Sequence, residues 1–385
     1  MSRSRMEAAN LAQSSALREM AAAVGKRPDP VLQLGINNLP VEGPDRWKTT
    51  RDFMTMKSVG IMQEWTGKDK LQARTGKAML EAEVFDMRAK LARAQVARDA
   101  SAAWTDRHFS AQQITLRSEQ LANAKNLVEA ADAAFRSARG MATDLHAARA
   151  EVTRAMDAVK EAEETQALAI SRLARWIGQD AAMRTTLVTA NTTSAIAPNI
   201  DAYALASKHA AVAIQRSQQE AAKASIAVAN TARKADWSWS LMYNKRGPAF
   251  SDMVSVNLSI PLQLDRAQKQ DREVAAALAM QQQVDDELQE TVHSLAAEIR
   301  QVHTQIQSRN DRLALHLNQL LPQLIERAAA ALRAYGNAQG TLSSAIDARQ
   351  SVTQTHLDAL RLRSDLAQLQ VQWAYLTNTD STAKE

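Results

Sequence analysis

Proline and glycine are absent from two long windows of the sequence, residues 77–139 and 263–321. These two residue types end or bend helices most readily, so each window can form one continuous helix. Extending each helix from the preceding predicted strand to the next glycine turn gives about 70 residues, or about 105 Å at 1.5 Å per residue. Such helices far exceed the average helix of a globular domain and predict an elongated, mainly α-helical chain.

The second window carries a narrow apolar seam. Its apolar residues recur at intervals of three and four: Val284, Leu288, Val292, Leu295, Ile299, Val302 and Ile306, then Leu313, Leu317, Leu320 and Leu324. This spacing is typical of a coiled coil rather than of a globular helix, and it leaves most of the helix surface in water. Pro322 is expected to kink this helix or to break its hydrogen bonding locally.

Composition supports a long-helix protein and excludes several classes of function. Only 4% of the residues are aromatic, and the chain of 385 residues has 8 prolines. The net charge is +5, but Lys and Arg alternate with Asp and Glu, as in residues 68–94. This mixture is typical of solvated helix faces, so we expect no nucleic-acid partner. Because there is no cysteine, disulfides, Cys-based zinc sites and thiol catalysis are excluded.

Four short segments depart from the helical pattern and alternate apolar with polar residues, which is typical of β-strands. They lie near residues 31–39, 53–65, 237–244 and 253–264. Two of them present a regular apolar face, whose residues are our candidates for contact with a membrane: Trp237, Trp239, Leu241, Tyr243, Val254, Val256, Leu258 and Ile260.

Such faces can be buried in a soluble sandwich or turned towards lipid. Strands of about 9 to 12 residues suit a tilted membrane-crossing strand, and Trp and Tyr near the strand ends are typical of membrane barrels. Lys57 falls on the apolar side, so we expect a strand end or a local bulge there.

Four strands cannot close a barrel alone, since known membrane barrels begin at about 8 strands and lipid does not tolerate open edges. A trimer would supply 12 strands.

The sequence also contains an internal repeat. Residues 59–65 align with 258–264, and residues 135–149 align with 335–349, a shift of about 200. The first predicted repeat, 1–198, holds a helix, the strand pair 31–65, a long helix to about residue 138, a returning helix to about 177 and a linker. The second, 199–385, holds a helix, the strand pair 237–264, a long helix to about 335, a returning helix to about 376 and a tail.

Together these features resemble the TolC-like outer-membrane efflux channels, also called outer membrane factors. The resemblance rests on the doubled plan, on the strand VSVNLSIPLQL (254–264) leading into a long helix, and on the turn AAALRAYGNAQGTLSSAIDARQSV (329–352). The first strand pair, from GKRPDPVLQLGINNLPVEGP to DFMTMKSVGIMQEW, is similar to the branch for heavy-metal efflux of the cobalt-zinc-cadmium and copper-silver types.

The resemblance implies an architecture and a set of partners. It implies a homotrimer in which 12 strands form a barrel in outer-membrane lipid and the long helices form a hollow α-barrel in the periplasm. It further implies docking of a periplasmic adaptor (membrane fusion) protein and of an inner-membrane, proton-driven pump of the RND type.

The resemblance also implies gate residues at the periplasmic tip. The tip turns would be near Arg139–Gly140 and from Gly336 to Gly340, where glycine permits the backbone angles of a tight reversal. Asp144, Asp347 and Tyr335 match the positions of the gate. The family gate also has an arginine and a further acid, and this sequence has Gly340 and Ser344 at those two positions. The resemblance therefore implies a simple ring of carboxylates without the salt bridges of the family gate.

The two aspartates have a second interpretation. A threefold ring of carboxylates would favour the passage of cations. The same side chains could instead stabilise the first turns of the returning helices, where acids are favoured.

No motif for catalysis, for a cofactor or for a protein-bound metal is present. The seven histidines include no His-x-x-x-His pair. Met54, Met56 and Met62 share one strand parity, and thioethers suit Cu(I) or Ag(I), but we expect these methionines to fill an apolar lipid or core face. Phosphate-binding glycine loops and nucleophile elbows are also lacking. We therefore expect no enzyme and no cofactor.

The predicted function is a passive outer-membrane duct that exports heavy-metal cations from a Gram-negative cell. Drugs or secreted proteins are alternative cargoes, and a cytosolic coiled-coil scaffold is the alternative of another class. The residues after Met1 lack the apolar segment of a signal peptide, so we expect that the start of the sequence is truncated or misassigned.

Overall fold

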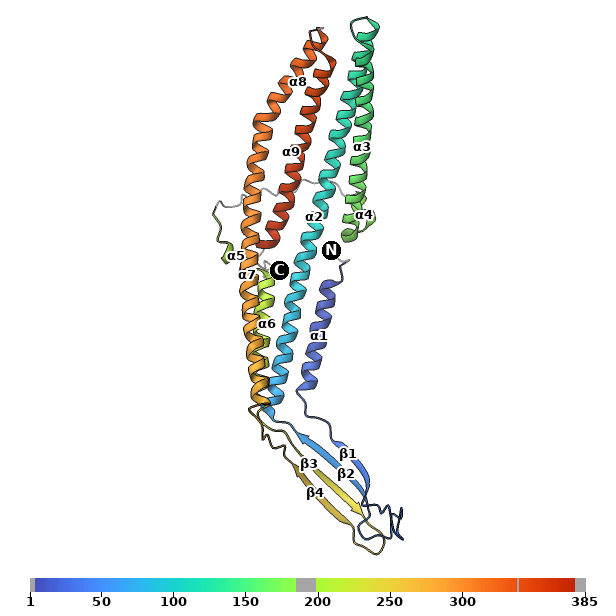
Figure 1. Ribbon diagram of the computed structural model, residues 1–385, viewed down its shortest axis with the longest axis vertical. Coiled ribbons are helices and arrows are strands. Elements are labelled where there is room, and N and C mark those ends of the chain that lie inside the picture. The colour runs from blue at the N-terminus through green and yellow to red at the C-terminus, as the bar shows by residue number, and fades with distance from the viewer. Residues whose placement is uncertain (1–3, 185–198, 338, 378–385) are drawn as a thin grey trace. The chain divides into compact units, whose positions relative to one another are not determined.

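The structure is a computed structural model that describes residues 4–184, 199–337 and 339–377. As predicted, it is mainly α-helical with four β-strands (Figure 1). Most of the predicted linker before residue 199 and the tail beyond residue 377 lie outside the described residues. In chain order the elements are α1 (Met6–Val24), β1 (Val31–Asn37), β2 (Met56–Trp65), α2 (Lys68–Arg136), α3 (Ala142–Ile177), α4 (Gln179–Arg184), α5 (Ala202–Ala206), α6 (Ala210–Thr231), β3 (Trp237–Lys245), β4 (Met253–Ser259), α7 (Gln270–Leu315), a π-helical turn η1 (His316–Leu320), α8 (Leu321–Gly336) and α9 (Leu342–Thr377).

The two long helices follow from the windows that lack proline and glycine. Helix α2 has 69 residues, and α7, η1 and α8 follow one another without a gap from Gln270 to Gly336. The disturbance expected at Pro322 is present as the π-helical turn directly before α8, in which the N–H of Leu321 donates to the carbonyl of His316. A π turn lets the helix continue where proline cannot donate a backbone hydrogen bond.

The described residues form two compact units, and each unit draws on both halves of the sequence. The sheet unit consists of residues 8–89 and 211–291, and the helical unit consists mainly of the described residues of 90–210 and 292–377. The division at residue 198 into two sequence repeats stays a prediction.

The sheet unit contains one antiparallel sheet with the strand order β1-β2-β3-β4 (Figure 1). One line of paired residues crosses all four strands: Leu34, Val59, Tyr243 and Val254. The central pairing, β2 with β3, joins segments that are far apart in the sequence. The edges of the sheet are β1 and β4, each of which has one neighbouring strand.

Three strands are shorter at one end than the sequence predicts, and of these β2 begins at Met56 rather than near Phe53. Strand β1 ends at Asn37 because Asn38 takes a left-handed backbone conformation with φ 54°. Strand β4 ends at Ser259 rather than at Leu264, since Pro261 follows and has no N–H for a ladder. Ile260 therefore lies just outside the strand.

The helical unit contains two antiparallel helix hairpins, α2 with α3 and α8 with α9 (Figure 1). The predicted seam of α7 packs against α9 between residues 292 and 313, where the buried Ile299, Val302 and Ile306 form a cluster with Leu366 and Leu376 of α9. A second cluster packs both hairpins together near their turns, with Leu127, Leu145, Leu342 and Ile346 among its members. Narrow seams thus hold long helices together while most of their surface stays exposed. Within the described residues, none of the helices combines the length and the apolar character that crossing a membrane requires.

A leucine pair tests the importance of the seam. Leu366 is 6% exposed in the α7–α9 cluster, whereas Leu168 of α3 is 53% exposed. We expect Leu366→Ala to lower the free energy of unfolding by about 2–5 kcal/mol through lost burial and a cavity, and Leu168→Ala to change it by less than about 0.5 kcal/mol. Urea unfolding followed by circular dichroism measures both. Equal losses in the two variants would contradict this packing.

Candidate functional site

The first feature of the site is an exposed apolar sheet face. The register brings three predicted residues of β3, Trp239, Leu241 and Tyr243, beside Leu258, Val256 and Val254 of β4. On β1 and β2 the same face continues through Leu32, Leu34, Ile36, Val59 and Ile61. Val256 is 73% exposed and Leu34 is 72% exposed. Contiguous apolar surface of this kind marks contact with a partner or a membrane.

The opposite sheet face is polar and internally hydrogen-bonded. The amide of Asn37 donates to the hydroxyl of Ser58 (2.6 Å), which donates to the side-chain oxygen of Asn244 (2.8 Å). The amide of Asn244 in turn donates to the hydroxyl of Ser255 (2.9 Å). These bonds connect all four strands across one face, with Ser58 and Asn244 buried. A sheet face made of polar side chains suits contact with water rather than with lipid.

The strand methionines do not lie where the sequence analysis expected. Met56 and Met62 have the same parity as Ser58, so they project on the polar face, and Met54 precedes β2. The expectation of an apolar lipid or core face was therefore wrong for Met56 and Met62. Strand parity alone fixes which residues share a face, but the pairing with β1 and β3 decides what that face contains.

The ends of the apolar face carry aromatic and basic side chains. At the end near the helices, Trp65 stacks on its cross-strand partner Trp237, with ring centroids 5.5 Å apart, and the guanidinium of Arg27 lies 3.6 Å from the Trp65 ring centroid. At the other end, Lys57 pairs with Lys245, the last residue of β3. Lys57 is thus at a strand end, as expected. Aromatic residues and lysines bordering an apolar band are typical of membrane interfaces.

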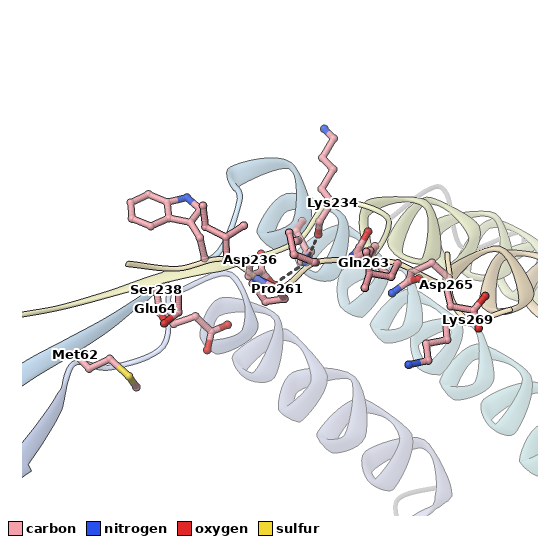
Figure 2. A pocket seen from close by; sticks show the side chains of 18 residues that line it. Met62, Glu64, Lys234, Asp236, Ser238, Pro261, Gln263, Asp265 and Lys269 are labelled. Carbon is pink, nitrogen blue, oxygen red and sulfur yellow. Dashed lines mark hydrogen bonds and ion pairs between the residues drawn. The ribbon is translucent and has the colours of Figure 1, made fainter. Parts of the chain in front are cut away.

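A cavity of about 920 Å³ lies at the junction of the strands with the helices of the sheet unit. Figure 2 shows Met62 and Glu64 of β2 at one side of it, with Ser238 and Asp236 close by. Lys70 also lines this cavity, and only 7% of the residue is exposed. Its ammonium group donates to the carboxylate of Asp236 (2.7 Å) and to the carbonyl oxygen of Lys234 (3.0 Å). A buried lysine needs such partners, and this pair fixes the start of α2 to the segment that enters β3.

The predicted tip turns join the hairpin helices, but the reason for their glycines differs from our expectation. The left-handed conformation in the first turn belongs to Ala138, with φ 55°, and not to Gly140. A Cβ on Gly140 would lie 3.0 Å from the Cβ of Ala134, and one on Gly340 would lie 3.1 Å from that of Ala334. These two glycines therefore permit close packing against the end of the preceding helix. Gly336 is the last residue of α8.

The three predicted gate residues lie near these turns. Asp144 is in the first turn of α3, where the helix dipole favours an acid. Asp347 is exposed and lies beyond the first turn of α9, so helix-end stabilisation does not account for it. Tyr335 packs against the cluster of Leu127, Leu145 and their neighbours. Burial raises the pKa of the Tyr335 phenol above its usual value, and the negative charge of Asp144 adds to this effect.

Ser344, which stands where the resemblance implies a gate acid, has a local structural role. The N–H of Ser344 donates to the hydroxyl oxygen of Thr341 (3.3 Å), and the Ser344 hydroxyl donates to the Thr341 carbonyl (2.8 Å). This arrangement stabilises the start of α9 as an N-terminal cap does. A carboxylate at this position is therefore not needed to begin the helix.

The histidines do not form a metal centre. Within the described residues, no group of three or more His, Cys, Asp or Glu side chains could hold a metal ion. The buried His209 lies edge-on to Tyr375, with ring centroids 5.1 Å apart. Burial lowers its pKa, while the charge of Glu298 acts in the opposite direction. His209 therefore belongs to the packing of the helical unit.

Sequence reasoning missed two features of the site. It did not single out the ion pair of Lys70 with Asp236, because the two residues are far apart in the chain. It also missed the hydrogen-bonded row of Asn37, Ser58, Asn244 and Ser255. The alternation indicated a polar face, but the contacts depend on register.

Comparison with known proteins gives the fold and not the family. No family model matches the sequence, and no curated protein matches it. Among solved structures, the transmembrane channel protein CusC matches with a TM-score of 0.81 and 14% identity over 97% of this chain and 88% of that one. The outer-membrane protein VceC of Vibrio cholerae matches with a TM-score of 0.77 and 17% identity, over 97% of this chain and 92% of VceC. The outer-membrane channel CmeC of Campylobacter jejuni matches with a TM-score of 0.80 and 12% identity, over 99% of this chain and 84% of CmeC. The chain therefore has the fold of outer-membrane channels.

The raised pKa of Tyr335 gives a pH-dependent prediction. An unfolded tyrosine loses its proton near pH 10.0, whereas the folded Tyr335 loses it at higher pH. Stability should therefore fall as the pH rises through 10 towards the folded value. We expect Tyr335→Phe to reduce this fall. It should change stability little at neutral pH, since the buried hydroxyl has no hydrogen-bond partner within the described residues. Thermal unfolding between pH 7 and 11 measures this, and an unchanged slope in the variant would contradict it.

Proposed function

We propose that the chain is one subunit of a homotrimeric outer-membrane channel of the TolC-like type. The observation that carries this proposal is the sheet with one exposed apolar face and one hydrogen-bonded polar face. A sheet of this kind is stable when one face meets lipid and the other meets water. The shared fold with outer-membrane channels supports the same conclusion.

The edges of the sheet account for the number of subunits. Strands β1 and β4 are edge strands, and their unpaired backbone groups would each cost several kcal/mol in hydrocarbon. Pairing β4 of one copy with β1 of the next removes both edges. Three copies supply 12 strands, which is enough for a closed barrel with an aqueous lumen.

The helical unit forms the wall of the duct on the periplasmic side. Its helices contact one another through narrow seams, as a wall with water on both sides requires. Asp144 and Asp347 form carboxylate rings at the closed end, and Tyr335 packs beside them. A periplasmic adaptor and a proton-driven inner-membrane pump of the RND type open that end, and the pump supplies the energy.

The cargo is a heavy-metal cation. The first strand pair resembles the metal-efflux branch, and Asp144 and Asp347 would raise the local concentration of cations by threefold repetition. The likeness to solved channels supports the duct and does not bear on the cargo.

Two neighbouring residues on opposite faces of β4 test insertion into the membrane. Val256 is on the apolar face and Asn257 on the polar face. We expect Val256→Lys to cost about 2–4 kcal/mol of insertion free energy near the bilayer centre, and Asn257→Lys to be tolerated. The measurement is the yield of folded trimer in the outer-membrane fraction. Equal yields, or recovery of wild-type chain in the soluble fraction, would refute the membrane assignment.

A deletion strain tests the cargo. We expect loss of the gene to sensitise cells to metal salts and not to drugs, and the wild-type gene to restore resistance. The double variant Asp144→Asn with Asp347→Asn should restore it only in part, because the carboxylates that attract cations are lost. Sensitivity to drugs alone would replace the metal cargo with the drug alternative.

A further inference from the structure

The strand methionines are confined to one face of the sheet. Met56 and Met62 of β2, Met242 of β3 and Met253 of β4 all share the polar face with Ser58 and its neighbours. The apolar face of these same four strands carries Leu, Ile, Val, Trp and Tyr, with Gln63 and two lysines towards its ends, but no methionine. On the polar face of these strands, Val31 is the one apolar residue other than methionine and glycine. If these four methionines served only as apolar residues, we would expect some of them on the other face. Its placement among serine, asparagine and glutamine needs a chemical reason.

Three of these methionines form a diagonal row. Met62 is paired with Ser240, two residues from Met242. Met242 is paired with Ser255, two residues from Met253. Diagonal neighbours on adjacent strands are about 7–8 Å apart at their Cα atoms, within reach of long side chains. Two thioethers from such neighbours can therefore meet at one ion.

Gly60 leaves room in the polar face for the side chain of Met242. It is paired with Met242 on β3 and lies two residues from Met62. A Cβ at Gly60 would lie 2.6 Å from the Cγ of Met242, so the Met242 side chain lies across the glycine. On the other side, the amide of Gln33 donates to the Met62 sulfur at 3.7 Å. Two thioether side chains and an amide thus lie around Gly60, whose missing side chain gives Met242 its place.

One methionine of the row also lines the junction cavity. Met62 and Glu64, which share the polar face, both line that cavity of about 920 Å³ (Figure 2). The Glu64 carboxylate is exposed and attracts cations to this end of the sheet. Neutral, polarisable thioethers then discriminate among cations, because they prefer soft Cu(I) and Ag(I) over ions such as Zn²⁺ and Mg²⁺.

We propose that Met62 and Met242 form a binding site for a soft monovalent cation, Cu(I) or Ag(I), with Met253 as the next ligand along the row. Its place inside a duct rests on the proposed function, and the site narrows the cargo from heavy-metal cations to soft ones. Since the ligands are neutral and few, binding is weak enough for the ion to pass from one thioether to the next.

Silver binding to the purified full-length chain in detergent tests the site. We expect Ag(I) to bind in equilibrium dialysis, Cu(I) to displace it, and Zn(II) to leave it bound. The double variant Met62→Leu with Met242→Leu keeps side-chain volume and should weaken binding at least tenfold. The matched control, Met79→Leu with Met280→Leu, removes two exposed methionines of the same unit and should bind as the wild type does. Equal loss in both double variants, or no loss in the first, would overturn the proposal.

A second measurement keeps the test valid if the first double variant does not fold. In the wild-type chain, Ag(I) should protect Met62 and Met242 from oxidation by hydrogen peroxide, while Met79 and Met280 are oxidised as before. Mass spectrometry of peptides reads out each sulfur, and uniform oxidation would reject the site. If the deletion strain is insensitive to metals while the purified chain binds Ag(I) through these sulfurs, the proposed cargo fails and the site stands.

Discussion

The separation of apolar from polar side chains across four paired strands is the constraint on which the rest of the structure depends. Because alternation is kept in register from β1 to β4, the sheet has two faces that need different surroundings. The row from Asn37 to Ser255 satisfies its own polar groups, whereas the apolar face is exposed. In the proposed channel, the edge strands β1 and β4 pair with those of neighbouring copies.

The helices of the helical unit bury only a small part of their surface against one another. Its helices are long, yet each is buried only along a seam, as Ile299, Val302 and Ile306 are. A compact domain would bury more of each helix. In the proposed channel, neighbouring helices and water cover the helix surface that this limited internal packing leaves exposed.

The sequence predicted those features that depend on local pattern. Windows without proline and glycine predicted α2 and the α7–α8 run, and Pro322 predicted the disturbed turn before α8. Strand ends were less accurate, because they depend on the backbone angle of Asn38 and on the missing N–H of Pro261.

Features that depend on pairing between distant segments were not predictable. The strand residues around Met62 include polar side chains of both parities, so only the pairing of β2 with β1 and β3 and the hydrogen bond from Gln33 assign the methionine to the polar face. The Lys70–Asp236 pair joins residues from opposite halves of the chain, and no local pattern announces it. The predicted gate residues were placed by family resemblance rather than by pattern, and the reason for Gly140 became clear only from its contact with Ala134.

The π-helical turn at His316–Leu320 has a geometric consequence for the second hairpin. A π turn takes up one residue more than an α turn, so every side chain after it is displaced around the helix axis by about 100°. In an uninterrupted heptad array, one inserted residue would put all later positions out of phase. Leu332 and Tyr335 in α8 therefore lie about 100° away from the positions that the heptad phase of α7 would give them.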